Sequence, residues 1–562
     1  MDRARVFRRL RGSGLTGSTG LFVFCLALAL VFLVRVPFFG FPALKYIKEY
    51  PRPEVRLDYA TYKGLTLHHN VNQYLGMRFA APPLDDLRWR APRDPPEEMD
   101  IQDASEFGPT CLGTNHNSYF GNEDEDCLFV NVWAPKDANE TTKLPVWVFI
   151  QGGGYTANSN ANYNGSEVVK ESGGKVVFVN FNYRVGLWGF LADERVREDG
   201  DLNVGLLDQR HLLHWVQKHI SKFGGDPNHV VIHGVSAGAG AAAMHLTAYG
   251  GRDDHLFTGV ATEAVFWPAQ PRVEDLGWQF NRTLKRVGCE DAESPMACLR
   301  SKSKRKLQKR ANRGRPFVGR DMPPNFYWTP CVDGDLIQDS PSNMFKSGKF
   351  VKVPVMLGTS TNEGTIFAAD AATPEEFTSF MRDNFPQLTD EDEKAMLEHY
   401  PKQEPRPQHE AWFPSAADAY GEATFICPTN LMLDSLAEAG LSNQTWSYRY
   451  NVHDKERDAS GVGVEHTFDR MAILGPDNVH AGALSYYTYN APMVPLMMNY
   501  YISFVRKLDP NLLRLDGAPE WGNWKDGERM KFELSASEME TTSEGQRERC
   551  RFWNGIAESM EQ

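Results

Sequence analysis

Metal-binding spacing is the first feature that this sequence lacks. Its 562 residues include eight cysteines, yet no two form a CxxC pair and none clusters with histidines at the intervals of a zinc site. Positive charge is also in deficit, because 60 Lys and Arg face 73 Asp and Glu, which leaves a net charge of −13. That balance argues against nucleic acid as a partner. We therefore expect neither a metal site nor a nucleic-acid-binding surface.

Long repeats, heptads and low-complexity tracts are absent as well, so nothing points to a repeat or fibrous architecture. What is present is the composition of an ordinary globular protein, with 41% hydrophobic and 24% charged residues. A chain of this length and composition can bury a large core.

One apolar run stands close to the N-terminus. Residues 1–19 carry five arginines and a single acid, and residues 20–34 are unbroken and apolar. We interpret 1–19 as a basic cytoplasmic region and 20–41 as a signal anchor, with Arg35 snorkelling to supply the length of roughly 20 residues that a span needs. A cleaved signal peptide is the alternative, although no small-x-small cleavage site follows the run.

Both interpretations send the rest of the chain into the secretory pathway, either as a single-pass type II membrane protein or as a secreted one. The membrane is a partner only if the segment stays uncleaved. Four glycosylation sequons agree with this route, and they begin at Asn139, Asn164, Asn281 and Asn443. Seven cysteines lie outside the apolar run, so at least one thiol stays unpaired if the others form bridges.

From about Leu144 onward the chain has an α/β pattern. Four stretches read as buried strands because they are apolar and β-branched; they are 146–150, 176–183, 230–235 and 353–357. A helical stretch around 206–223 joins the second to the third, with its apolar residues on one face. Strand, helix and strand at this spacing predict a parallel sheet with crossover helices. Catalytic groups then belong at the carboxyl ends of the strands.

Ser236 is the first candidate for such a group. It stands in Gly234-Val235-Ser236-Ala237-Gly238, between a strand and a stretch of small residues that favours a thin, closely packed helix. Glycines two residues before and after a serine allow the sharp strand-turn-helix of a nucleophile elbow. A tight glycine turn without catalysis is the alternative from this stretch alone.

Three further features supply what a serine nucleophile needs. Gly152-Gly153-Gly154 follows a strand and can point consecutive N–H groups at a developing oxyanion, together with the Ala237 N–H. Glu363 lies in the polar loop after the strand at 353–357 and can orient an imidazole. The order serine, acid, histidine leaves five histidines as the base, which are His399, His409, His453, His466 and His480. His233 is interpreted as a core histidine, because an elbow turns its serine away from its own strand.

At these residues the chain resembles the type-B carboxylesterase/lipase family, the cholinesterase-like α/β-hydrolases. The resemblance extends over about residues 55–557, and its details point to a filamentous-fungal branch. It rests on these stretches: YLGMRFAAPPLDDLRWRAP (74–92), EDEDCLFVNVWAP (123–135), NYRVGLWGFL (182–191), NVGLLDQRHLLHWVQKHISKFGGDPNHVVIHGVSAGAG (203–240), and later TSTNEGTIF, GVGVEHTFD and ERCRFWNGI.

The resemblance implies an α/β-hydrolase fold, with a large, mostly parallel sheet flanked by helices, in a single domain over residues 44–558. It also implies specific roles for residues. The family's Gly-x-x-His-x-x-acid motif falls on Gly463 to Asp469, which makes His466 the base, with Glu363 as its acid and Ser236 as the nucleophile. The oxyanion donors correspond to Gly153, Gly154 and Ala237, and the acyl pocket to Phe326 and Trp328. The family's disulfides fall on Cys111–Cys127, Cys289–Cys298 and Cys427–Cys550, so that Cys331 remains free.

Several positions depart from the family's pattern. The residue before the serine is Val235 where a glutamate is usual, Thr262-Glu263-Ala264 replaces Gln-Ser-Gly, and Gln151 precedes the triple glycine in place of His or Tyr. The loop 112–126 lacks the tryptophan that holds a quaternary ammonium in cholinesterases, which argues against a choline-ester specialist.

Together these features predict a cofactor-independent serine carboxylesterase acting on small to medium hydrophobic or aromatic esters. Acyl transfer, including modification of a secondary metabolite, remains an alternative; a lipase and a non-catalytic adhesion module are weaker ones. Residues 300–315 hold nine Lys or Arg and are interpreted as a solvated helix face.

Overall fold

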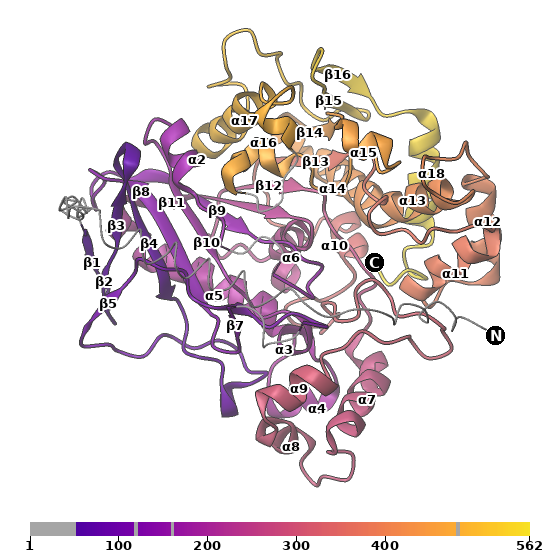
Figure 1. Ribbon diagram of the computed structural model, residues 1–562, viewed down its shortest axis with the longest axis horizontal. Helices are drawn as coiled ribbons and strands as arrows, with labels where there is room; N and C mark the ends of the chain where they lie inside the picture. Colours follow the sequence, from indigo (N-terminus) through magenta and orange to yellow (C-terminus); the bar gives the residue numbers. More distant parts are fainter. Residues whose placement is uncertain (1–51, 117–121, 159–161, 479–483) are drawn as a thin grey trace, which may run out of the picture. The chain divides into compact units, whose positions relative to one another are not determined.

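The computed structural model describes residues 52–562, except 117–121, 159–161 and 479–483 (Figure 1). The expected basic region 1–19 and apolar segment 20–41 lie outside the described residues. Within the described ranges, no helix combines the length and the apolar character that crossing a membrane requires. Residues 51–562 make up one compact unit.

A mixed sheet of eleven strands runs through this unit (Figure 1). In spatial order the described strands are β16 (Glu538–Thr541), β15 (Glu528–Phe532), β14 (Thr445–Tyr450), β13 (Val355–Ser360), β12 (Gly259–Glu263), β11 (Gly225–Val235), β9 (Leu144–Ile150), β10 (Val177–Phe181), β8 (Phe129–Pro135), β4 (Val71–Arg78) and β3 (Leu65–Leu67). From β15 to β10 every neighbouring pair is parallel, whereas β16 and the β8–β4–β3 edge are antiparallel. The mostly parallel sheet that the sequence predicts is confirmed, with antiparallel edges added.

Two small sheets and a set of helices complete the described chain. The small sheets are β1 (Glu54–Arg56), β2 (Thr61–Lys63) and β5 (Ile101–Asp103), and β6 (Thr110–Cys111) with β7 (Glu123–Asp124). The helices are α2 (Ser166–Glu171), α3 (Gly186–Phe190), α4 (Glu194–Asp199), α5 (Val204–His219), α6 (Ala237–Gly251), α7 (Gly277–Val287), α8 (Pro295–Ser301), α9 (Lys304–Arg310), α10 (Pro341–Lys346), α11 (Pro374–Asn384), α12 (Asp390–His399), α13 (Phe413–Gly421), α14 (Cys427–Leu436), α15 (Lys455–Ala459), α16 (Arg470–Leu474), α17 (Met493–Lys507) and α18 (Glu544–Gly555).

Both faces of the sheet are covered, which explains why its central strands read as continuous apolar runs. On β9, Val146, Val148 and Ile150 point into the core that α5, α6 and α14 close. Trp147 and Phe149 point into the opposite core, which α2, α16 and α17 close. The alternation follows from the period of two along a strand. The helix expected over 206–223 is α5 together with a 3₁₀ turn at Ile220–Phe223.

All three disulfides that the resemblance implies are formed. They are Cys111–Cys127, Cys289–Cys298 and Cys427–Cys550. The third joins α14 to α18 and so ties the C-terminal helix to the body. Cys331 is the free thiol among the described residues, and burial raises its pKa.

Most basic side chains of the 300–315 run and the four sequons lie on the surface, although Arg300 is buried. Helix α9 exposes Arg305, Lys306, Lys309 and Arg310 and buries Leu307, as expected for a solvated helix face. All four sequon asparagines are exposed; they are Asn139, Asn164, Asn281 and Asn443.

Candidate active site

Ser236 occupies the turn between β11 and α6. Its φ of 56° and ψ of −120° lie outside the usual regions for a residue with a side chain, and such strained conformations concentrate at functional sites. The flanking glycines permit the turn, because a Cβ on Gly234 would lie 2.1 Å from the Gly238 carbonyl oxygen. The backbone of Ser236 is held from both sides: its N–H donates to the Glu263 carbonyl at 2.8 Å, and its carbonyl accepts from the Gly240 N–H at 2.9 Å. The elbow that the sequence predicts is therefore present.

The glycine triplet lies beside this turn. A Cβ on Gly238 would come within 2.0 Å of the Ile150 carbonyl oxygen, so the end of β9 approaches the start of α6 as closely as backbone allows. Gly153 and Gly154 have φ values of 119° and 61°, a region that favours glycine. Ala237 is the first residue of α6, and its N–H has no acceptor within the helix. The loop and the helix N-terminus thus present backbone donors on the same side of the sheet.

His466 pairs with Glu363 at the carboxyl edge of the sheet. The His466 Nδ1 is hydrogen-bonded to Glu363 Oε2, and the Ser360 N–H donates to the other carboxylate oxygen. Both side chains are buried, with exposed fractions of 7% and 1%. This pairing fixes the imidazole with a proton on Nδ1 and leaves Nε2 as the acceptor. Nε2 is buried and has no hydrogen-bond partner among the described residues, including Ser236.

The other described histidines do not face Glu363. His399 packs on Phe552, His409 contacts Asp370, and His453 contacts Asp458. His480 lies outside the described residues. Of the candidate histidines that the structure describes, His466 is the one that contacts Glu363.

Aromatic rings surround His466 and extend to the glycine loop. The Phe425 ring, from the π-helical segment Glu422–Ile426, lies 4.3 Å from the imidazole, and the Phe367 ring lies 5.0 Å from it. The half-buried Phe326 packs 4.7 Å from Phe266 and 5.8 Å from Phe367. A Cβ on Gly154 would meet the Phe326 ring at 1.9 Å, so this ring closes directly on the loop.

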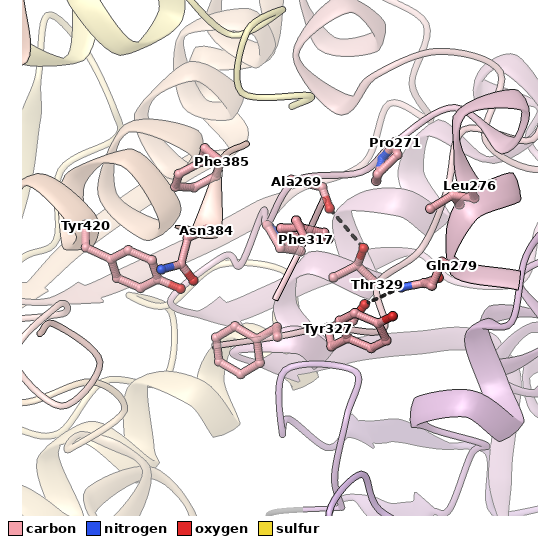
Figure 2. Close-up of a pocket in the computed structure, with 12 residues that line it drawn as sticks. Ala269, Pro271, Leu276, Gln279, Phe317, Tyr327, Thr329, Asn384, Phe385 and Tyr420 are labelled. Atoms are coloured by element: carbon pink, nitrogen blue, oxygen red, sulfur yellow. Dashed lines mark hydrogen bonds between the residues drawn. The ribbon is translucent and has the colours of Figure 1, made fainter. Parts of the chain in front are cut away.

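Trp328, the second residue expected in the acyl pocket, is placed differently. It is 1% exposed, packs on Tyr327 and does not line the pocket that Phe326 borders. Phe326 lines that pocket together with Phe317, Tyr327, Phe385 and Tyr420, and the last four are labelled in Figure 2. Hydrogen bonds from Thr329 to the Ala269 carbonyl and from Gln279 to the Tyr327 carbonyl brace the wall, each at 2.9 Å (Figure 2).

A second buried carboxyl group, that of Glu263, lies on the α17 side of the sheet. The sequence did not show which way this side chain points. Glu263, at the end of β12, lies 2.9 Å from His233 Nε2, and both side chains are fully buried. Burial raises the pKa of Glu263 to about 8 and lowers that of His233 to about 3. His233 is thus the core histidine that the sequence predicts, but with an acidic neighbour that no motif pointed to. The alternation of β12 could have shown that Glu263 faces inward.

Comparisons with known proteins identify the family of this chain. The model of the carboxylesterase family matches residues 51–553. The chain belongs to the carboxylesterase family. Its structure is similar to the crystal structure of Aspergillus niger EstA, with a TM-score of 0.89, 46% identity, and coverage of 91% of this chain and 99% of that one.

Fungal lipases are among the relatives of this carboxylesterase. Lipase 2 of Geotrichum candidum is 29% identical over 506 residues, which are 79% of this chain and 85% of the lipase. Lipase 2 of Diutina rugosa is 27% identical over 502 residues, with coverage of 83% and 87%. The enzyme is therefore a carboxylic ester hydrolase with the α/β-hydrolase fold.

Proposed function

We propose that this carboxylesterase cleaves esters through an acyl-enzyme intermediate on Ser236, with His466 as the base and Glu363 as its orienting acid. The observation that carries the proposal is the buried His466–Glu363 pair at the strand edge beside the strained Ser236 turn. A serine hydroxyl becomes a good nucleophile only when a base removes its proton. His466 Nε2 is the acceptor that the Glu363 contact leaves available.

The steps follow from the positions of these groups. Ser236 Oγ attacks the ester carbonyl while Nε2 takes its proton, and the Gly153, Gly154 and Ala237 N–H groups hold the oxyanion. The imidazolium then protonates the leaving alcohol. Water, deprotonated by Nε2, attacks the acyl-enzyme and releases the acid.

The acyl side of the site favours small to medium hydrophobic or aromatic groups. Phe326 closes on the oxyanion loop, and Phe266 and Phe367 pack against it, so a long straight chain meets ring faces rather than an open groove. Apolar pockets of this kind discriminate by shape and size rather than by charge.

Active-site labelling tests the nucleophile. A fluorophosphonate probe is expected to label the wild type and to leave Ser236→Ala unlabelled, with Ser342→Ala, a buried serine on α10, as the matched control that still labels. Labelling that survives Ser236→Ala contradicts the assignment. No labelling of the folded wild type favours an adhesion role.

A series of p-nitrophenyl esters tests the substrate class. We expect an optimum at short or aromatic acyl groups, measured as kcat/KM with and without an acceptor alcohol. Product partitioning toward a new ester in the presence of the alcohol indicates acyl transfer, whereas activity rising steadily with chain length indicates a lipase.

The secretory route is proposed on two structural features. Three disulfides form in oxidising compartments, and all four sequon asparagines are exposed. Endoglycosidase treatment is expected to increase the gel mobility of the native protein, and an unchanged mobility contradicts the route. N-terminal sequencing of the mature protein distinguishes an anchor from a cleaved signal peptide.

A further inference from the structure

Two buried carboxyl groups lie immediately behind the proposed triad. The backbone carbonyl of Glu263 accepts from the N–H of Ser236, and Asp469 follows His466 by three residues. The carboxyl groups of Glu263 and Asp469 are close enough for each to affect the pKa of the other, and both residues are at most 1% exposed. They therefore connect the nucleophile's neighbouring strand to the histidine segment.

Hydrogen-bond donors are too few for two charged carboxylates at this place. The Trp147 indole donates to His233 Nδ1 at 3.1 Å, which places the His233 proton on Nε2. That proton points toward Glu263 Oε1 at 2.9 Å but is poorly aligned for a hydrogen bond. The Tyr448 hydroxyl donates to Asp469 Oδ2. Both oxygens of Glu263 and the Oδ1 of Asp469 are then buried without a hydrogen-bond donor.

A proton between the two carboxyls removes this deficit. An acid O–H donates to its neighbour, whereas two ionised carboxylates in contact repel each other and lose their hydration. Burial, followed by the charge of Glu263, raises the pKa of Asp469 well above its ordinary value. No salt bridge to either carboxyl from an arginine or lysine forms among the described residues. Arg470 lowers the pKa of Glu263 only from a distance, against the effect of burial.

We propose that Glu263 and Asp469 share one proton and act as a singly charged acid pair that positions His466 and sets its basicity. The proposal rests on the proposed role of His466 as the base. The pair is a positioning element, because neither residue touches the substrate. One proton moves between two oxygens, and no other bond changes.

The effect on His466 is electrostatic and mechanical. The pair carries one negative charge on the α17 side of the sheet, in addition to the charge of Glu363, and this charge stabilises the imidazolium that forms during attack. Val235, the register partner of Glu263 on β11, is apolar and adds no charge of its own. The Asp469 contact also ties the His466 segment to the strand that holds the Ser236 N–H.

Other ionisable groups face the pair, and the experiment has to account for them. They include His233 on β11, Glu363 at the strand edge, Tyr448 on β14, Arg470 on α16 and Tyr501 on α17. Burial raises the pKa of both tyrosines and lowers that of His233, so these three stay neutral near pH 7.

The pH profile of kcat/KM tests the proposal with amide substitutions. Glu263→Gln or Asp469→Asn alone leaves one negative charge, so the acid limb of the profile is expected to stay within a few tenths of a pH unit of its wild-type position. The double variant removes that charge, and the acid-limb pKa is expected to fall by about one unit. A further inflection near pH 8, where the wild type loses the shared proton, is expected to vanish in either single variant. A single variant that shifts the acid limb as far as the double overturns the proposal.

Infrared spectroscopy of the wild type provides a readout that needs neither activity nor a variant. At pH 7 one protonated-carboxyl C=O stretch is expected in the wild type, it disappears on titration through about pH 8, and it is absent in both Glu263→Gln and Asp469→Asn, where the remaining carboxyl is ionised. Absence of that band in the folded wild type overturns the proposal even if the triad is confirmed. If the band is present but the fluorophosphonate probe does not label Ser236, the acid pair is supported and the proposed function is wrong.

Discussion

Replacement of Glu363 by glutamine is the sharpest test of the proposed triad, because the change keeps the shape and removes the charge. Glu363 accepts from the Ser360 N–H on one oxygen and from His466 Nδ1 on the other. A glutamine amide offers one oxygen and one NH₂ group. If the oxygen faces His466, the NH₂ meets the Ser360 N–H donor to donor; if the NH₂ faces His466, it forces the proton onto Nε2, and the base is lost.

The magnitude follows from these two orientations. The second orientation satisfies both neighbours' hydrogen bonds, so it is expected to dominate in a site where the acid is 1% exposed. The wrong tautomer in a comparable serine triad lowers kcat by about 10⁴. We therefore expect kcat of Glu363→Gln to fall by about 10³ to 10⁴, which corresponds to roughly 4 to 5.5 kcal/mol of transition-state stabilisation.

The assay is kcat for a short p-nitrophenyl ester, read beside the rate of fluorophosphonate labelling and the thermal unfolding midpoint. Both rates are expected to fall together, since both depend on His466 as the base. Glu465→Gln is the matched control, because Glu465 lies beside His466 in sequence but pairs outward with Arg457. A folded Glu363→Gln enzyme that keeps kcat within tenfold of the wild type refutes the role given to Glu363.

Three further predictions follow from the structure. Gly154→Ala is expected to cost about 10² or more in kcat/KM, since the new Cβ displaces the ring that closes on the oxyanion loop; Gly173→Ala, with a similar φ but nothing within 4 Å, is the control that keeps activity. Replacing Cys427 and Cys550 by serine, across a separation of 123 residues, is expected to lower the unfolding free energy by about 2 to 5 kcal/mol, and an unchanged melting temperature contradicts this. Burial raises the pKa of Glu263 to about 8 from 4.5, so the folded protein holds a proton that the unfolded chain releases, and stability falls as the pH rises across that window by up to about 1.4 kcal/mol per unit. The free energy of unfolding of Glu263→Gln, measured in urea at pH 5 and pH 8, is expected to change less between the two pH values than that of the wild type. An equal change in both proteins contradicts the prediction.

Much of the fold could be predicted because its signals are local. The stretches that read as strands within β9, β11 and β13 are mostly apolar, since helices cover both faces of the sheet. The antiparallel edge strands could not be predicted in the same way. Their residues are fewer and more mixed, and pairing between distant segments leaves no periodic trace.

In the candidate site, too, features set by local sequence could be predicted and features set by tertiary packing could not. Gly234 and Gly238 predict the elbow, because only glycine tolerates the backbone contacts at these two positions. Phe326 packs against Phe266 and Phe367 and closes on Gly154, whereas Trp328, two residues on, is buried against Tyr327. Spacing alone does not show which side of a loop meets a cavity.

The sequence by itself determined the central sheet, the Ser236 turn and the glycine loop, because each depends on residue types within a few positions of one another. Tertiary structure decided which histidine pairs with Glu363, because the partners are 103 residues apart and meet only when β13 and the segment after β14 lie side by side. Tertiary structure also decided the protonation of the Glu263 carboxyl group. A glutamate at a strand end is ordinarily charged, and only the packing of α16 and α17 over β12 removes it from water and brings Asp469 against it. Burial and contact are properties of the assembled chain, and they set the charge on which this part of the chemistry depends.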